Sequence, residues 1–303
     1  MRQIKQTTRR SIAFYTMIAP WLIVFLSFAL FPLVYGFYLS FTNYFGFNLE
    51  DLSLVGLKNY QNVFNDKDAM GALGRTFLFA AINVPLGTVI ALTLALLLNH
   101  NIRGRSVFRT IFYIPSIMPA IVTTMMWKNI LFTGNGGILD RIIGFFGLGP
   151  VNWLGYDYAL FSLVLMSSWG AGGGILIYLA GLKGVPDELY ESAAIDGASY
   201  MQRLFRITLP LLTPVIFFNV LMGIIGTLQQ YLQPILLAGD QLLARPIKPI
   251  YLYVVHAFQQ IFANQRFAYG MALLWVLFLI TLLLTLVVFK TSRLWVFYED
   301  GGD

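Results

Sequence analysis

Few residues in this sequence have the types and spacing needed for catalysis or metal binding. The chain has no cysteine and two histidines, His100 and His256, which fall on opposite sides of the predicted membrane topology. A paired-ligand metal centre, a thiol nucleophile and a serine–histidine pair at one depth are therefore excluded. The cluster Gly170–Gly174 lies in an apolar segment without a preceding strand, and the phosphate-binding pattern G-x-x-x-x-G-K-[ST] is absent. The sequence predicts a protein that is not an enzyme and does not power a reaction itself.

A set of neutral polar residues lies within the apolar segment 207–239. Its members carry amide, hydroxyl or phenol groups: Asn219, Thr227, Gln229, Gln230, Tyr231 and Gln233. Such groups at membrane depth either bind neighbouring helices or offer donors and acceptors to a polar solute. No Lys or Arg lies in the segment, and an unpaired buried charge is costly. A solute bound here is therefore expected to be neutral, and helix–helix packing is the alternative.

The stretch 181–210 predicts two short helices joined at a glycine. Pro186 suits a first helical turn, and the two acidic residues after it favour the positive end of the helix dipole. The helix should break at Asp196–Gly197, because glycine tolerates the positive φ of a tight turn. A capping box S-x-x-Q begins at Ser199 and predicts a second short helix, which Pro210 should end or kink. The result is either a solvated connector or a rigid protruding knob.

Six apolar segments surround these residues, and each is long enough to cross a bilayer. A transmembrane helix needs about 20 apolar residues, and only six stretches of at least 18 residues lack Asp, Glu, Lys and Arg. A shorter run, Pro249–Gln265, contains one histidine and three glutamines and is interpreted as interfacial or re-entrant. The prediction is an all-α membrane protein with one domain over residues 1–303, a cytoplasmic loop at 183–210, and spans at about 12–40, 76–99, 110–132, 158–181, 211–238 and 268–290.

Composition supports the membrane assignment. Hydrophobic residues make up 58% of the 303 residues and charged residues only 11%, against roughly 45–50% and 25% in soluble domains. So few charges cannot cover a soluble surface. The net charge of +6 is too small and too scattered for nucleic-acid binding, and basic residues beside the spans explain it.

The distribution of Lys and Arg predicts the orientation, because basic residues gather on the cytoplasmic side. With six spans both termini share one side, and the long run after Arg9–Arg10 has no small-residue cleavage site, so it is an uncleaved first span. Both termini are thus predicted to be cytoplasmic. That side carries 12 of the 20 basic residues: Arg2, Lys5, Arg9, Arg10, Arg103, Arg105, Arg109, Lys183, Arg203, Arg206, Lys290 and Arg293.

The loop 183–210 contains a longer spacing pattern. Glu191-Ser-Ala, three residues, Gly197, nine residues and then Ile207-Thr-Leu-Pro210 follow E-A-A-x3-G-x9-I-x-L-P, with Ser192 where alanine is usual. This resembles the signature of permease subunits of binding-protein-dependent ATP-binding-cassette (ABC) importers of the carbohydrate-uptake, maltose-permease-like family. Weaker similarity extends over nearly the whole chain. The resemblance implies the type I ABC importer permease fold in a minimal six-helix form.

The resemblance also implies a division of labour with partners. A coupling helix would dock on a cytoplasmic ATPase dimer, which binds ATP and Mg, so this chain needs no cofactor. A second homologous permease would complete the path, and an extracytoplasmic solute-binding protein would deliver a sugar. The location would be a prokaryotic cytoplasmic (inner) membrane, which the chain crosses several times. The residues implied in coupling are Glu191, which would make a charge-assisted contact, together with Ser192, Ala193, Asp196, Gly197 and Pro210.

Positions matching the family's sugar contacts fall in the fourth and fifth expected spans. Those implied by the resemblance are Gly170, Gly173, Gly223, Gly226, Thr227 and Gln230. Tyr231 is added to the expected substrate path because its ring offers a flat apolar face to a sugar. Close helix packing is the alternative role for the glycines. Trp169, beside the glycine cluster, is interpreted as an interfacial anchor.

Two alternatives to a sugar importer subunit remain. One is a permease of the same family that carries an anionic sugar or glycerol phosphate. The other is a stand-alone secondary carrier or channel, which should show an internal repeat or an intramembrane charge. The sequence shows neither feature.

Overall fold

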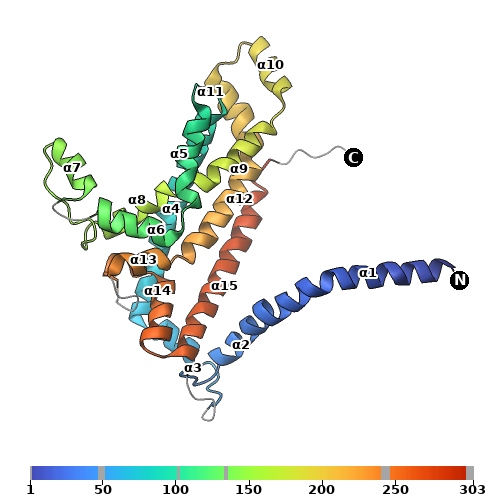
Figure 1. The fold of residues 1–303 in the computed structure, drawn as a ribbon, viewed down its shortest axis with the longest axis vertical. Coiled ribbons are helices and arrows are strands. Elements are labelled where there is room, and N and C mark those ends of the chain that lie inside the picture. Colours follow the sequence, from blue (N-terminus) through green and yellow to red (C-terminus); the bar gives the residue numbers. More distant parts are fainter. Residues whose placement is uncertain (1, 47–51, 101–102, 133–135, 240–245, 298–303) are drawn as a thin grey trace. The chain divides into compact units, whose positions relative to one another are not determined.

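The computed structural model describes residues 2–46, 52–100, 103–132, 136–239 and 246–297, which form two compact units. The other positions of the expected domain 1–303 lie outside the described residues, as do the side chains of Arg2 and Lys5. Within the described part the chain is helical, with no strand and one isolated antiparallel bridge between Thr42 and Leu54 (Figure 1). The expected all-α fold class is confirmed.

Unit 1 comprises the chain up to Asp66 together with Gln260–Val276. Its rings and hydrogen bonds join the end of α2 and the loop after it to the start of the last helix. The Phe37 and Trp275 rings lie 4.6 Å apart, and the Tyr269 hydroxyl donates to an Asp66 carboxylate oxygen at 2.7 Å. Its elements are α1 (Arg2–Phe25), the π-helical turn η1 (Leu26–Leu30), α2 (Phe31–Ser40), α3 (Lys58–Asn65) and the first part of α15 (Phe267–Ser292).

Unit 2 comprises Lys67–Gln259 and the chain from Leu277 onwards. In chain order its elements are α4 (Lys67–Asn99), α5 (Arg105–Ile117), α6 (Ala120–Met126), η2 (Trp127–Leu131), α7 (Ile138–Phe145), α8 (Ala159–Trp169), α9 (Gly172–Lys183), α10 (Asp187–Ile195), α11 (Tyr200–Arg203), η3 (Leu204–Thr208), α12 (Leu209–Leu228), α13 (Leu232–Ala238), η4 (Lys248–Ile250), α14 (Tyr253–Phe258), the start of η5 (Gln259–Ala263) and the second part of α15.

Four helical stretches of the described chain are long and apolar enough to cross a membrane on their own. They are Thr8–Ser40, Lys67–Asn99, Tyr200–Leu228 and Phe267–Ser292. Two bent helix pairs bring the number to six when each pair is counted as one span: α5 with α6–η2, bent by 102°, and α8 with α9, bent by 43°.

The expected span 110–132 is not one straight helix. Helix α5 ends at Ile117, and Met118 takes an extended conformation with φ −67° and ψ 137°. Pro119 follows, and the ring of a proline disfavours the helical conformation of the residue before it. The apolar run 110–132 therefore contains a sharp turn, although it is free of charged residues up to Trp127.

The expected span 211–238 is interrupted as well, since α12 ends at Leu228 and α13 begins only at Leu232. Pro234 lies in the first turn of α13. It has no N–H to donate to the carbonyl of Gln230, and its ring would press against that carbonyl if α12 continued. The two helices are consequently separate elements.

The run Pro249–Gln265 forms short helices, and one of them, α14 in unit 2, packs against α4. The Arg75 guanidinium donates through Nε to the Tyr251 carbonyl at 3.0 Å, and the Tyr253 N–H donates to the Thr76 hydroxyl at 2.8 Å. Both bonds satisfy backbone groups that a short non-spanning segment would otherwise leave unpaired. Protein contacts thus hold this segment in place.

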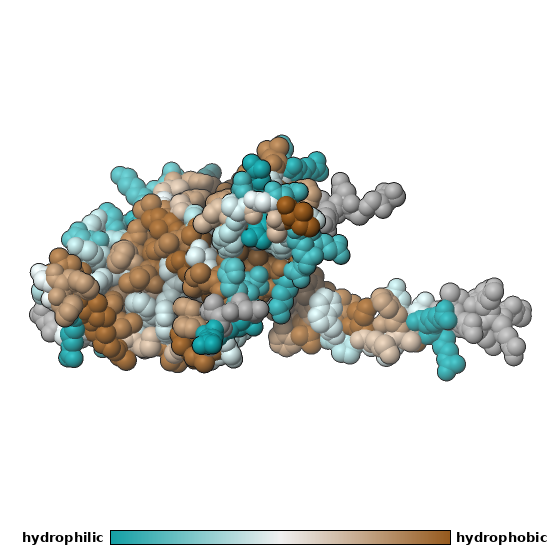
Figure 2. Space-filling view, turned by 90° about the horizontal axis from the view of Figure 1, so that it is seen from above, coloured by the Kyte–Doolittle hydropathy of each residue, from teal (hydrophilic) through white to brown (hydrophobic). Residues whose placement is uncertain are grey.

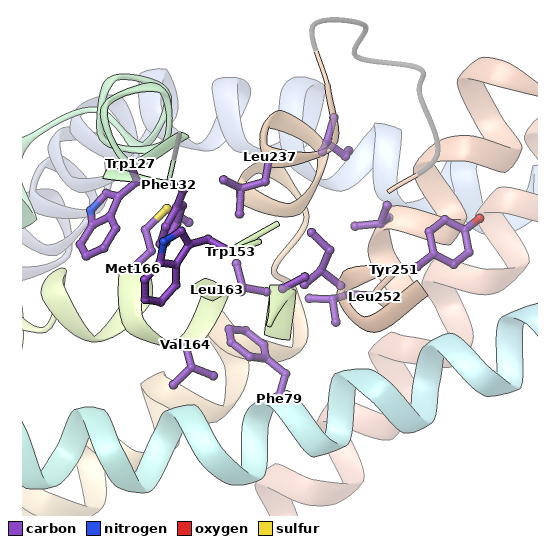
Figure 3. Packing of buried hydrophobic residues seen from close by; sticks show 14 of the residues in the cluster. Phe79, Trp127, Phe132, Trp153, Leu163, Val164, Met166, Leu237, Tyr251 and Leu252 are labelled. Carbon is purple, nitrogen blue, oxygen red and sulfur yellow. The ribbon is translucent and has the colours of Figure 1, made fainter. Parts of the chain in front are cut away.

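Two apolar clusters fix the helices of unit 2. In the first, Trp127, Phe132 and Trp153 gather beside Met166 of α8 (Figure 3), and the rings of Phe132 and Trp153 stack at 5.9 Å. The second joins α4, α9 and α12, which pack against one another. Its buried members are Ala91, Ala95, Leu98, Ile175, Tyr178, Leu179, Leu182 and Leu212.

One close approach in unit 2 requires a glycine. Gly172, the first residue of α9, is buried against α5, and a Cβ at this position would overlap the backbone oxygen of Phe112. The neighbouring Gly173 is exposed, and a Cβ there would meet only Ser116, at an ordinary 3.9 Å.

These two glycines yield a matched test of the packing. Gly172→Ala should destabilise the protein by about 1–3 kcal/mol, because backbone must move to admit the methyl group. Gly173→Ala should be neutral or slightly stabilising, because alanine is the better helix former. Thermal unfolding of the purified chain in detergent, followed by tryptophan fluorescence, measures both. Equal transition temperatures for the two variants would contradict the packing described.

Candidate functional site

The loop 183–210 forms a protruding knob, defined here as residues 187–203. Helix α10 begins at Asp187, directly after Pro186, with Asp187 and Glu188 in its first turn. None of its residues is buried, and Ile195 at its end is 87% exposed. Figure 2 looks onto this end of unit 2 and shows hydrophilic residues with isolated hydrophobic ones among them. The knob therefore presents a mixed polar and apolar surface.

The elbow after α10 is a complete Schellman motif. Gly197 has φ +75°, the left-handed conformation that favours glycine. Its N–H donates to the Ala194 carbonyl at 3.1 Å, and the Ala198 N–H donates to the Ala193 carbonyl at 2.9 Å. These bonds satisfy carbonyls that the helix end would leave unpaired. The glycine break expected at Asp196–Gly197 is present.

The second helix of the knob begins with the expected capping box. The Ser199 hydroxyl accepts from the Gln202 N–H, and the Gln202 side chain accepts from the Ser199 N–H. Pro210 does not end this helix, although ending it is one of the two expected outcomes. Helix α11 continues through the π-helical turn η3 into α12, so Tyr200–Leu228 is one stretch of 29 residues. The Leu209 N–H bonds five residues back, to Leu204, and Pro210 follows this widened turn.

The residues implied in coupling fall into two places. Glu191, Ser192, Asp196 and Gly197 are exposed on the knob, while Ala193 is half-buried and supplies a carbonyl to the elbow. Pro210 is half-buried at the start of α12 and does not share that surface.

A side-chain hydrogen bond ties α10 to the long helix Tyr200–Leu228. The Tyr190 hydroxyl of α10 lies 2.9 Å from the hydroxyl of Thr208, which is buried in η3. With the elbow and the capping box, this contact fixes α10 relative to the long helix.

A cavity of about 310 Å³ lies between α4, α8, α9 and α12. Among the described residues that line it there is no Asp, Glu, Lys or Arg. The Asn83 amide donates to the Thr227 hydroxyl at 3.3 Å across it. Its polar lining groups belong to Asn83, Thr88, Ser167, Tyr178, Asn219 and Thr227.

Two of the seven positions implied in sugar contact, Gly223 and Thr227, line this cavity. Gln230 donates to the Gln233 side chain beyond the end of α12, and Tyr231 stacks on Phe258 with ring centres 6.1 Å apart. Neither these two nor Gly170, Gly173 and Gly226 are among the described lining residues.

Sequence reasoning missed the contributions of the second and fourth expected spans. Asn83 and Thr88 of α4 and Ser167 of α8 are isolated polar residues in apolar runs. The signal that could have revealed the α4 residues is that Asn83 and Thr88 lie on either side of Gly87. Glycine together with neutral polar residues also characterises the fifth expected span.

Residues 83–293 match the protein family described as the inner membrane component of binding-protein-dependent transport systems. The chain belongs to this family. The expected resemblance is confirmed, and the permease is a membrane component of a larger transport system. Membership of this family argues against the alternative of a stand-alone carrier or channel, because the family consists of components of binding-protein-dependent transport systems.

Relatives of known description share much of the sequence. The permease is 36% identical over 307 residues to the probable ABC transporter permease protein YesP of Bacillus subtilis, covering 100% of this chain and 97% of the relative. It is 35% identical over 219 residues to the trehalose/maltose transport system permease protein MalF of Thermococcus litoralis, covering 72% of this chain and 74% of the relative. The arabinooligosaccharides transport system permease protein AraP of Bacillus subtilis is 31% identical over 281 residues, or 92% of this chain and 88% of that protein.

The fold matches a solved importer. A chain of a bacterial ABC transporter involved in the import of the acidic polysaccharide alginate superimposes with a TM-score of 0.82 at 22% identity, over 96% of this permease and 98% of that chain. This likeness confirms the expected importer permease fold.

The elbow of the permease is open to a conformational test. No heavy atom lies within 4 Å of a Cβ built on Gly197, so only the backbone opposes a side chain there. Gly197→Val should cost about 1–3 kcal/mol and speed hydrogen exchange of the Ala198 amide roughly 5- to 150-fold. Gly197→Asn should stay near the parent rate, because asparagine enters the left-handed region readily. Exchange measured by mass spectrometry over residues 187–203 reads this out, and equal rates in both variants would contradict the motif.

Proposed function

We propose that this permease is the transmembrane subunit of an ATP-driven sugar importer and that its knob is the coupling element. The observation that carries the proposal is the single helix Tyr200–Leu228, which joins the knob to the polar cavity. At 1.5 Å per residue such a helix is about 40 Å long, enough to cross the bilayer core. Thr227 lies near one end of it and the capping box at the other.

The knob carries the features that a docking element needs. It is exposed, it includes Glu191 for a charge-assisted contact with a basic group, and its caps fix it internally. Motion of a docked ATPase would therefore move α10 and the long helix together. The cavity would then open to alternate sides by rigid-body rocking, with a second permease completing the path and ATP and Mg held by the ATPase.

The proposed orientation places the knob and both termini in the cytoplasm of a prokaryotic cell. The excess of Lys and Arg on that side supports it. A solute-binding protein would deliver substrate on the other side, in keeping with the family description and with the solved alginate transporter bound to its periplasmic protein.

The proposed substrate is a neutral sugar. The cavity lining offers hydroxyl and amide groups and, among the described residues, no charge. A carboxylate or phosphate there would lose its hydration without a cationic partner from this chain, at a cost of several kcal/mol. The relatives named for trehalose, maltose and arabinooligosaccharides point to the same class.

The docking and its orientation have a direct test, because the chain has no cysteine. A single cysteine at the exposed Ile195 should react with a membrane-impermeant maleimide in inside-out vesicles only, and bound ATPase should protect it. Adding Glu191→Lys should remove the protection by reversing the contact charge. Glu188→Lys, the same change one turn earlier on the exposed helix, is the matched control and should leave protection in place. Labelling from outside the cell would refute the orientation, and persistent protection in the Glu191 variant would refute its role.

The cavity has a separate test in the assembled transporter. Thr227→Val should raise the apparent KM for uptake of a neutral oligosaccharide roughly 5- to 100-fold, because a polar group facing the lost hydroxyl goes unsatisfied at a cost of about 1–3 kcal/mol. Thr281→Val is the control, since that buried hydroxyl bonds the Leu277 carbonyl of its own helix and lies outside the cavity. Equal KM values would exclude this cavity from the path, and uptake of anionic saccharides alone would overturn the neutral substrate.

A further inference from the structure

A second cavity, of about 230 Å³, lies at the base of the knob. Its walls come from the end of α4, the end of α9, helix α10 and the start of the long helix. The lining residues are Leu96, Asn99, His100, Leu182, Tyr190, Tyr200, Arg203, Leu204 and Thr208. The proposed transport path does not use this cavity.

Hydrogen-bonding groups from distant parts of the chain converge on it. The Nε2 atom of His100 lies 3.3 Å from the Tyr200 hydroxyl on one wall. The hydroxyl pair of Tyr190 and Thr208, 2.9 Å apart, forms another. No carboxylate is among the described residues that line the cavity, so its fixed full charge is the positive one of Arg203.

Arg203 has an unsatisfied donor at this place. Its Nε atom is buried and makes no hydrogen bond within the described part of the chain. A buried donor without an acceptor costs about 1–3 kcal/mol, and more when it is charged. Arg203 itself lines the cavity, and a guanidinium presents N–H groups in a fork that matches two oxygens of a phosphate group.

We propose that this cavity binds a phosphate group, with Arg203 as its main contact and with His100 and Tyr200 as further hydrogen-bonding groups. The ends of α4 and α9 each oppose an anion with about half an elementary charge, and the start of the long helix at Tyr200 favours it by a similar amount. The net effect of these helix ends is smaller than the full charge of the guanidinium. The volume falls below the range of roughly 300–1,000 Å³ usual for drug-sized ligands. A single phosphate-bearing group, either soluble or the headgroup of a lipid, fits that size.

Occupancy would have a mechanical consequence. The phosphate would link the end of α4 to the long helix directly below the elbow, beside the contact between Tyr190 and Thr208. It would add a further link between the knob and the membrane helices, so the site is expected to stiffen the knob.

The test uses the full chain purified in detergent and titrated with inorganic phosphate by isothermal calorimetry. Saturable binding is expected, weakened at least tenfold in Arg203→Gln. Arg206→Gln is the matched control, because Arg206 belongs to the same turn η3 but is exposed and does not line the cavity. His100→Gln should weaken binding several-fold without touching Arg203, which guards against a folding defect in the first variant.

A second arm separates the two sources of phosphate. The same variants in nanodiscs of phosphatidylcholine, with and without phosphatidylglycerol, report lipid binding as a shift in thermal unfolding temperature. A shift that requires the anionic lipid and Arg203, with no binding of inorganic phosphate, assigns the site to a headgroup. Binding of soluble phosphate that requires Arg203 assigns it to a free anion. If neither ligand binds, or if Arg203→Gln and Arg206→Gln behave alike, the proposal is overturned.

Discussion

A proline inside a helix removes one N–H and presses on the carbonyl four residues earlier, and the helix Tyr200–Leu228 contains two, Pro210 and Pro214. The helix accommodates the first with the widened turn η3, where the Leu209 N–H reaches back to Leu204. It accommodates the second with a side chain, because the Thr213 hydroxyl donates to the Pro210 carbonyl at 2.6 Å, the acceptor that Pro214 cannot serve. The helix continues past both prolines, so the knob and the polar cavity lie on one helical stretch.

The rigidity of the knob has the same local character. Its elbow and its capping box are closed by backbone and side-chain bonds that span a few residues each. A longer contact, between Tyr190 and Thr208, joins α10 to the same helix. These bonds give the knob a defined shape.

The sequence predicted the features whose causes are local. The break at Gly197, the capping box at Ser199 and the all-α membrane class all follow from short-range rules and composition. It did not predict the turn at Met118 or the π-helical turn before Pro210. Whether a proline in an apolar run breaks, bends or merely widens a helix depends on the residues that pack around it. The cavity escaped for a related reason: Asn83 and Thr227 meet across helices far apart in the sequence, and their pairing depends on tertiary packing.

Because the space around Gly197 is open, the effect of backbone conformation at this position can be distinguished from the effect of side-chain size. A glycine can resist substitution because an added side chain would clash with a neighbouring residue. At Gly197 no neighbour is close enough to clash, so only the backbone angle φ of +75° disfavours another residue. That conformation is the mirror image of the one an L-residue adopts in a right-handed helix. A D-alanine introduced by chemical synthesis would thus suit the elbow better than its L-enantiomer, although both add the same methyl group. At this position the stability of the knob depends on the chirality of the residue and not on its size.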